Sequence, residues 1–202
     1  MDAVRSLGLV VPDGQPLVWA LRALGHRDAT RVYGPDLMAA YCAHAARTGT
    51  AMYLYGGRSE EALVELTLRL RTRFAGIRIV GGHTPPFREL SDEEDEAVAL
   101  AIERSGAAVV WVGIGQPRQE LWIERMRERL CTPMLIAVGA AFDFHAGLDA
   151  QAPAWMGASG LEWSYRLARE PRRLWRRYAR YNPRFLVAFA RQYARERGGR
   201  WA

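Results

Sequence analysis

The chain has 202 residues, which suits one ordinary domain with a core that needs no disulfides. Its 28 basic residues are all arginine and outnumber 22 acids, giving a net charge of +6. The absence of lysine excludes a P-loop and any Schiff-base or pyridoxal chemistry. Arginine suits bidentate phosphate contacts, although a GC-rich coding sequence would explain the bias equally well.

The cysteines and the lengths of the apolar runs indicate the cellular compartment in which the protein is made. Cys42 and Cys131 lie far apart in apolar segments, so we expect two buried thiols in a reducing environment rather than a disulfide. No apolar run reaches the roughly 18 residues that a spanning helix needs. The run from Leu7 to Val11 is too short for a signal peptide. We therefore expect synthesis in the cytosol.

Alternating apolar runs and helical periodicity predict an α/β fold. In chain order, we expect a strand over 7–11, a helix over 15–24 and a helix over 36–47 capped by Asp36. Further strands are expected over 51–55, 77–80, 107–112 and 134–138, separated by helices over 60–74, 91–104 and 117–130. Continuous apolar strands between helices indicate a Rossmann-like parallel sheet with helices on both faces.

Glycines follow the predicted strands. They occur at Gly56 and Gly57, at residues 81–82, at Gly113 and Gly115, and at Gly139. Ligands of parallel sheets bind outside the carboxyl ends of the strands, so we expect all four glycine segments at the binding edge.

The last 42 residues differ in charge from the rest. Residues 161–202 hold 12 arginines and 3 acids, whereas the preceding 160 residues carry a net charge of −3. Prolines 171 and 183 divide this tail into three expected amphipathic helices with arginine on one face and Trp, Tyr or Phe on the other. We therefore predict an α/β domain over 1–160 and a basic helical appendage over 161–202 that lies on an anionic membrane. A nucleic-acid-binding arm is the alternative, but the aromatic stripe favours a bilayer, so we expect no nucleic-acid partner.

Three polar segments are candidates for chemistry. The run from Gly113 to Glu120 connects a strand to a helix, which favours an anion site, with a plain tight turn as the alternative. Asp143 follows the last strand and could bind a sugar hydroxyl or orient a catalytic group, with an N-cap or turn aspartate as the alternative. Asp13 ends the first predicted strand, where a general base or a simple Asp-Gly turn is expected. Arg31 could pair with a phosphate or lie on the surface. No metal-ligand cluster is apparent, so we expect neither a metal nor another cofactor.

Taken together, these segments resemble the WecG/TagA/CpsF glycosyltransferases, glycosyltransferase family 26. The matching stretches run in order over nearly the whole chain: Val11–Gly14, Arg31–Leu37, Tyr53–Gly57, Gly113–Trp122, Val138–Gly147 and Gly160–Tyr178. The resemblance implies metal-independent, inverting transfer of an N-acetylmannosamine-type or related sugar from a UDP-sugar. The implied acceptor is a sugar on undecaprenyl diphosphate, in cell-surface polysaccharide or teichoic-acid-like polymer synthesis at the inner face of the cytoplasmic membrane.

The resemblance also implies roles for individual residues. Asp13 matches the family's general base, and Arg31 matches an arginine near the donor phosphates. Gln119 and Asp143 match substrate-pocket positions. Three appendage arginines match residues that stabilise the departing diphosphate: Arg166, Arg173 and Arg176.

The chain also departs from the family's pattern. The family carries a further strand and helix before the Asp-Gly motif, with Thr and Asn residues of the donor pocket, whereas Met1 lies twelve residues before Asp13. We therefore expect a shortened member, with a non-catalytic binding or partner module as the alternative to an active transferase. The sequence does not decide between a monomer and a homo-oligomer.

Overall fold

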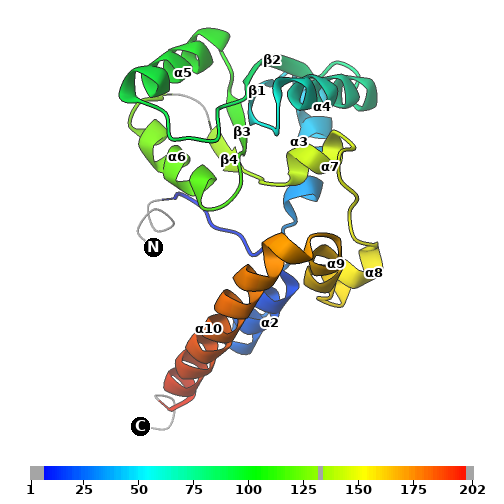
Figure 1. Cartoon of the computed structure of the whole chain (residues 1–202), viewed down its shortest axis with the longest axis vertical. Helices are drawn as coiled ribbons and strands as arrows, with labels where there is room; N and C mark the ends of the chain where they lie inside the picture. Colours follow the sequence, from blue (N-terminus) through cyan, green and yellow to red (C-terminus); the bar gives the residue numbers. More distant parts are fainter. Residues whose placement is uncertain (1–6, 132–133, 199–202) are drawn as a thin grey trace. The chain divides into compact units, whose positions relative to one another are not determined.

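The computed structural model describes residues 7–131 and 134–198 (Figure 1). They form two compact units, each discontinuous in sequence. The first, the sheet unit, contains residues 7–10 and 34–150, and the second, the helical unit, contains residues 11–33 and 151–198. The expected division after residue 160 remains a prediction.

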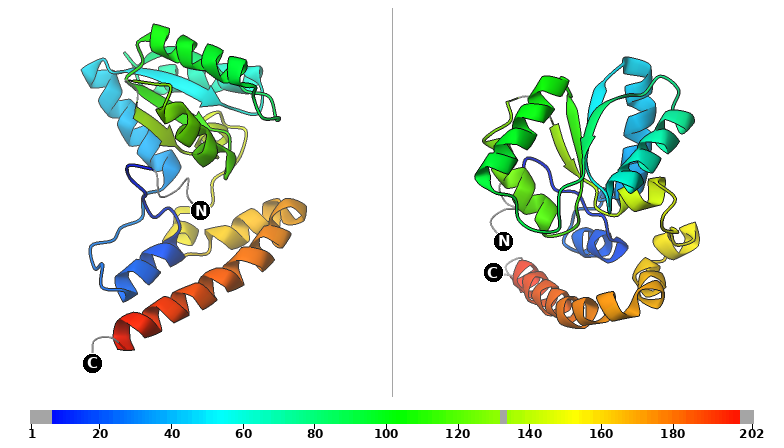
Figure 2. Two further views of the ribbon diagram at one scale, coloured as in Figure 1. Left: turned by 90° about the vertical axis from the view of Figure 1, so that its left-hand side faces the viewer. Right: turned by 45° about the horizontal axis from the view of Figure 1, so that its top comes forward.

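The sheet unit is built on four parallel strands in the order β2-β1-β3-β4. These strands are β1 (Ala51–Gly56), β2 (Arg78–His83), β3 (Val109–Gly113) and β4 (Met134–Ala137). The surrounding helices are α3 (Gly34–Thr48), α4 (Glu60–Arg73), α5 (Asp92–Ser105), α6 (Arg118–Arg127) and α7 (Ala141–His145). Helices cover both faces of the sheet (Figure 2). The predicted Rossmann-like α/β fold is confirmed.

Two hydrophobic clusters hold these layers together. One lies beneath α3, α4 and α7 and includes Met52, Leu66 and Trp111. The other lies beneath α5 and α6 and includes Ile102 and Trp122. Side chains that alternate along β1 and β3 enter opposite clusters, because successive residues of a strand face opposite sides of the sheet. Every residue of β1 is buried, as its continuous apolar sequence predicts.

Local capping explains where several helices begin. Ser91 caps α5, and its hydroxyl and the Glu94 carboxylate form a reciprocal capping box, as expected from sequence. The prediction that Asp36 caps α3 is wrong, because that helix begins at Gly34 and Asp36 lies in its first turn. An acid there still interacts favourably with the helix dipole.

The strand expected over residues 7–11 is also wrong. This segment is irregular, and its backbone joins no ladder of the sheet. Leu9 and Val10 are exposed, so the apolar run lacks the neighbouring strand and the buried face that would stabilise it. Asp13 therefore does not lie at the end of a strand, which removes the positional argument for a base there but leaves the one from the family resemblance.

Gly81 and Gly82 lie within β2 rather than beyond it. Pairing of β2 with β1 shifts register after Met52, so that Tyr53 faces Gly81. A Cβ atom on Gly81 would lie 2.5 Å from the Tyr53 ring. Packing under this ring explains why glycine continues the strand here.

The helical unit contains α2 (Gln15–Ala23), α8 (Ala154–Ala158), α9 (Glu162–Arg169) and α10 (Pro171–Gly198). The prediction that Pro183 separates two helices is wrong, because α10 continues through it. Helix α2 lies alongside α10 (Figures 1 and 2), and the two line a hollow of about 430 Å³. Within residues 7–131 and 134–198, no helix is long and apolar enough to cross a membrane.

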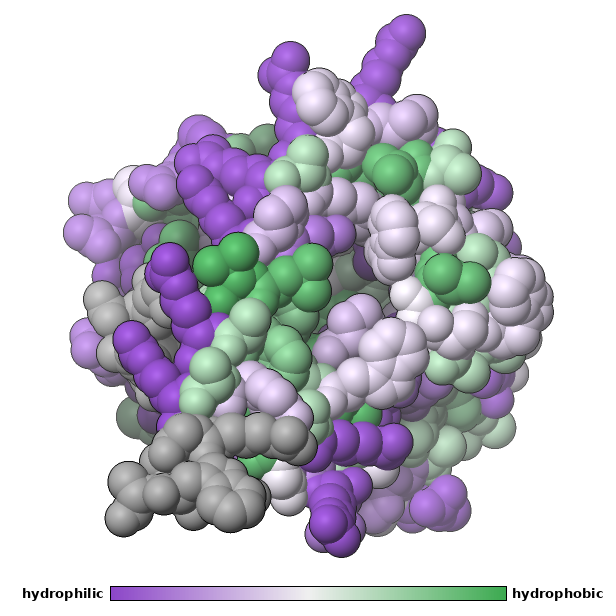
Figure 3. Space-filling model, turned by 90° about the horizontal axis from the view of Figure 1, so that it is seen from below, coloured by the Kyte–Doolittle hydropathy of each residue, from purple (hydrophilic) through white to green (hydrophobic). Residues whose placement is uncertain are grey.

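The helical unit places arginines beside exposed apolar side chains. Trp175, Tyr181 and Leu186 of α10 are all more than half exposed. Arg176 and Arg180 each stack on an aromatic neighbour, with the guanidinium carbons 5.4 and 5.9 Å from the ring centroids. Seen from below, apolar and hydrophilic side chains lie side by side on the surface (Figure 3).

Candidate functional site

The carboxyl ends of β1 and β3 meet at the point where the strand order reverses. From β1 the chain crosses to β2 on one side and then returns to β3 on the other, and such a switch point is where α/β sheets bind ligands. Gly56 pairs with Gly113 there, and the Gly57 amide donates to the Gly113 carbonyl at 3.3 Å. The structure thus brings together the glycines predicted at these two strand ends.

Close packing accounts for two of these glycines. A Cβ atom on Gly56 would lie 2.5 Å from the Gly113 carbonyl oxygen, and one on Gly113 would lie 2.6 Å from the Phe142 ring. A Cβ on Gly115 would instead have no atom within 4 Å, and its φ of +77° is one that glycine adopts without strain. Gly115 therefore gives the loop before α6 its turn and leaves open space beside it.

Gln119 contributes a buried amide next to this loop. It is only 4% exposed. Its Nε2 donates to Glu120 at 3.1 Å, whereas its Oε1 has no hydrogen-bond partner in the described part of the chain. A Cβ on Gly139, just beyond β4, would lie 3.6 Å from that oxygen. An unpaired buried carbonyl is costly, so it is suited to accept a hydrogen bond from a ligand.

Asp143 is held by an arginine that the sequence analysis missed. Arg58 follows Gly57 at the end of β1, and its Nε lies 2.9 Å from Asp143 Oδ1. Its Nη2 lies 3.5 Å from Asp149. Asp143 is half-buried within α7 rather than capping it. An arginine directly after a strand-glycine-glycine segment is the signal that could have identified Arg58.

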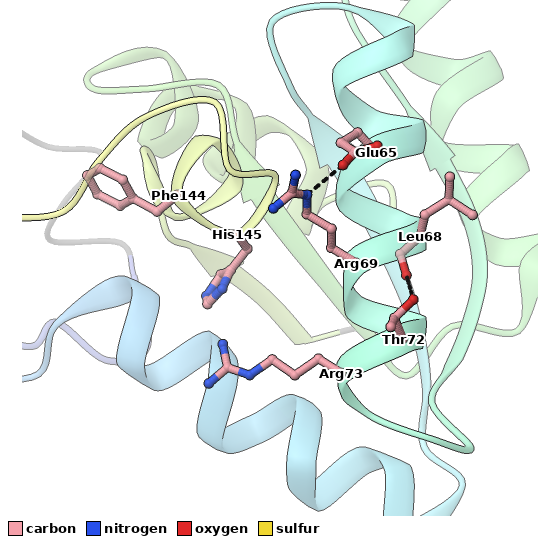
Figure 4. A pocket seen from close by; sticks show the side chains of 7 residues that line it. All are labelled: Glu65, Leu68, Arg69, Thr72, Arg73, Phe144 and His145. Carbon is pink, nitrogen blue, oxygen red and sulfur yellow. Dashed lines mark hydrogen bonds and ion pairs between the residues drawn. The ribbon is translucent and has the colours of Figure 1, made fainter.

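A hollow in the sheet unit is lined by none of these residues. It measures about 530 Å³ and is lined by α4 and α7, including Arg69, Arg73 and His145 (Figure 4). Arg69 is paired with Glu65 at 2.5 Å. Burial lowers the pKa of His145, and Arg73 lowers it further, while a hydrogen bond with the Pro35 carbonyl opposes this shift. This hollow holds none of the predicted site residues.

The helical unit assembles a second group, the Asp13 cluster. It contains the predicted residues Asp13, Arg31 and Arg166, together with Tyr33 and Glu162, which were not predicted. Arg31 Nε donates to the Asp13 carbonyl oxygen at 2.5 Å, and its Nη2 lies 3.9 Å from Asp13 Oδ1. The Asp13 side chain is 65% exposed, so its carboxylate is accessible from solvent.

Electrostatics link Tyr33 to the same cluster. The Arg31 guanidinium stacks over its ring at 4.4 Å. Burial raises the pKa of Tyr33 well above its ordinary value, as do Glu162 and Asp13, against the opposing effects of Arg166 and Arg31. The phenol therefore stays protonated at neutral pH and can donate a hydrogen bond. Arg166, predicted from the appendage motif, thus belongs to the Asp13 cluster.

Of the other two predicted appendage arginines, the structure describes the side chain of Arg176 alone. Arg176 is exposed and stacks on Trp175. The side chain of Arg173 lies outside the described part of the structure. Metal ligation has no visible basis in the described ranges, where no three His, Cys, Asp or Glu residues gather.

A parallel sheet with a buried amide and a carboxylate-arginine pair near its carboxyl edge has the architecture of nucleotide-binding α/β enzymes. The family model described as "Glycosyl transferase WecG/TagA/CpsF family" matches residues 1–199. The chain therefore belongs to this glycosyltransferase family. Membership implies a role in cell-surface polymer synthesis with a nucleotide-sugar donor and a lipid-linked acceptor.

Proposed function

We propose that the chain transfers an N-acetylmannosamine-type or related hexose from a UDP-sugar to a sugar on undecaprenyl diphosphate. Asp13 is the general base of an inverting, metal-independent reaction. The protein works as a peripheral enzyme at the inner face of the cytoplasmic membrane. The single observation that carries this proposal is the Asp13 cluster, in which the exposed Asp13 carboxylate lies beside Arg31 and Arg166 acts electrostatically on the neighbouring Tyr33, within a chain of this family.

The proposed chemistry follows from these groups. Asp13 takes the proton of the acceptor hydroxyl, and the hydroxyl oxygen attacks the anomeric carbon from the face opposite the nucleotide. The bond between that carbon and the diphosphate oxygen breaks, and UDP leaves with the electron pair. Arginines near the diphosphate offset its developing negative charge, which is the role we assign to Arg166, Arg173 and Arg176.

The sheet unit is proposed to bind the donor. The backbone amides after β3 offer hydrogen-bond donors to a nucleotide sugar, and the buried Gln119 carbonyl offers an acceptor. Asp143, held by Arg58, offers a fixed carboxylate to a sugar hydroxyl. Gly56, Gly57, Gly113 and Gly115 shape this edge through close packing and turn geometry.

The exposed aromatic side chains of α10, beside arginines, support membrane association. Such a helix inserts its apolar side chains at the headgroup boundary, while its cations attract anionic lipid.

A transfer assay with the purified chain tests this function. Radiolabelled UDP-N-acetylmannosamine is incubated with an undecaprenyl-diphosphate-linked N-acetylglucosamine acceptor in EDTA. We expect a lipid-linked disaccharide with an inverted anomeric centre. Saturable binding of the UDP-sugar and acceptor lipid without turnover would contradict this proposal and support the binding-module alternative.

A further inference from the structure

Arg31 is shared between two carboxylate-bearing residues of the helical unit. Its Nη2 lies 2.5 Å from Glu162 Oε2 and 3.9 Å from Asp13 Oδ1. Glu162 is the first residue of α9 and lies 131 positions away in sequence. The Arg31 and Glu162 side chains are only 20% and 17% exposed, so solvent screens their pairing little.

The rest of the guanidinium is fixed in the same place. Nε donates to the Asp13 backbone carbonyl, and Val32 N donates to the Pro12 carbonyl at 2.9 Å. A Cβ on Gly157 would lie 2.8 Å from Arg31 Nη1, so glycine at this position makes room for the arginine. Both sides of Arg31 are therefore constrained, and its position defines that of Asp13.

We propose that Glu162 is a positioning residue that holds Arg31 in place and withholds its charge from the Asp13 carboxylate. Glu162 neutralises the nearest Nη2 group, which lets Arg31 orient Asp13 through the backbone while the carboxylate remains a competent base. This role rests on the proposed function of Asp13. It also revises the expectation for Arg31, whose guanidinium orients the base instead of serving only the donor phosphates.

The expected pH effect follows from the charges around Asp13. Arg31 lies beside Asp13 and pairs with Glu162 of α9. Tyr33 interacts electrostatically with Asp13, and also with Glu162 and Arg166 of α9. Replacing Glu162 by a neutral residue leaves the positive charge of Arg31 uncompensated. This change stabilises the Asp13 carboxylate, so its pKa falls and it becomes a weaker base.

The test compares Glu162→Gln with Glu162→Asp, and with Glu196→Gln on the exposed face of α10 as a matched control. For Glu162→Gln we expect kcat to fall at least tenfold with an unchanged KM for UDP-sugar. The acidic limb of the rate profile should move to lower pH. Glu162→Asp should restore the wild-type position of that limb, and Glu196→Gln should match the wild type in every respect.

Titration of the Asp13 carboxyl carbon by NMR separates this inference from the proposed function. A lower Asp13 pKa in Glu162→Gln supports the positioning role even if no transfer is detected in the wild type, a result that would overturn only the proposed function. An unchanged Asp13 titration together with an unchanged acidic limb overturns the positioning role. A loss of kcat that tracks a loss of thermal stability, without recovery in Glu162→Asp, overturns it as well.

Discussion

At the residue scale, Gly56 shows how tightly the sheet's binding edge is packed. A side chain there would meet the oxygen, carbon and Cα of Gly113 within 2.9 Å, and backbone atoms cannot move aside as a flexible side chain can. We expect Gly56→Ala to reduce the free energy of unfolding by about 2–4 kcal/mol. Chemical denaturation followed by circular dichroism measures this change.

Gly106 provides the matched control for that substitution. It ends α5 with a φ of +66°, but a Cβ there would have no atom within 4 Å. Gly106→Ala should therefore cost only about 1 kcal/mol, the conformational penalty alone. Equal losses in the two variants would show that the contact with Gly113 is unimportant.

A substitution at Gln119 should weaken ligand binding while lowering the stability of the fold only modestly. The Oε1 atom of Gln119 has no partner among the described residues, so Gln119→Leu should lower the free energy of unfolding only through loss of the Nε2 bond to Glu120, by about 1–2 kcal/mol. Loss of the ligand hydrogen bond should weaken UDP-sugar binding about tenfold. Isothermal titration calorimetry measures the affinity, and chemical denaturation measures the stability. An unchanged affinity in a strongly destabilised variant would contradict a role for Gln119 in binding.

The two cysteines differ more than the sequence suggested. Cys42 is buried as expected, and burial raises its pKa to about 12, whereas Cys131 is exposed, contrary to the prediction. Cys131 lies after the end of α6. The apolar residues near it in the sequence did not show whether its side chain would be buried. In the native protein, a thiol reagent should modify one cysteine rapidly, and Cys131→Ser should abolish this fast reaction. A fast reaction that persists in Cys131→Ser would contradict the buried state of Cys42.

At the element scale, the C-terminal helices show where amphipathic periodicity is informative and where proline misleads. The arginine and aromatic faces of α10 were predicted, but its continuity through Pro183 was not. Proline inside a helix removes one backbone hydrogen bond and crowds the carbonyl four residues before it, which is why the sequence favoured two helices where one is observed. Leu174 is buried at the start of α10, which anchors that end to the helical unit.

The exposed face of α10 gives a testable membrane contact. Replacing Trp175, Tyr181 and Leu186 together by alanine removes three exposed apolar groups and no charge. We expect partition into phosphatidylglycerol vesicles to fall more than tenfold without loss of helix content. Leu100→Ala, on the exposed face of α5, is the control and should leave binding unchanged. Equal binding by the triple variant would show that this face of α10 does not contact lipid.

At the whole-molecule scale, the sheet was predictable because short apolar runs alternate with helical periodicity, and because Ser59 and Ser91 cap α4 and α5. Residues 7–11 were misassigned because an apolar run reveals nothing about whether a neighbouring strand exists. The assembly of the Asp13 cluster was only partly predictable. Asp13 and Arg31 follow from the motifs, but the Arg31–Glu162 pair joins segments 131 positions apart, and no local pattern encodes it.

The loss of folding stability at high pH depends on buried groups from several parts of the molecule. Burial raises the pKa values of Cys42, Tyr33, Tyr53 and Tyr55 in the folded state. The contribution of these groups to stability is therefore complete below their pKa values in the unfolded chain, near pH 9–10. It declines as the pH rises towards their pKa values in the folded protein. Thermal melts should show a falling midpoint between about pH 9 and 11. A constant midpoint across this range would mean that these groups are not buried in solution.

The central claim is that Asp13 is the base of a sugar transfer. Its most direct test is the turnover of Asp13→Asn with UDP-sugar and the lipid-linked acceptor, measured beside UDP-sugar affinity. Asparagine keeps the size and polarity of the side chain but cannot accept the hydroxyl proton. We predict that transfer falls at least 1,000-fold, on the order expected for loss of a general base, while donor affinity stays within about twofold. Turnover close to that of the wild type would contradict the account.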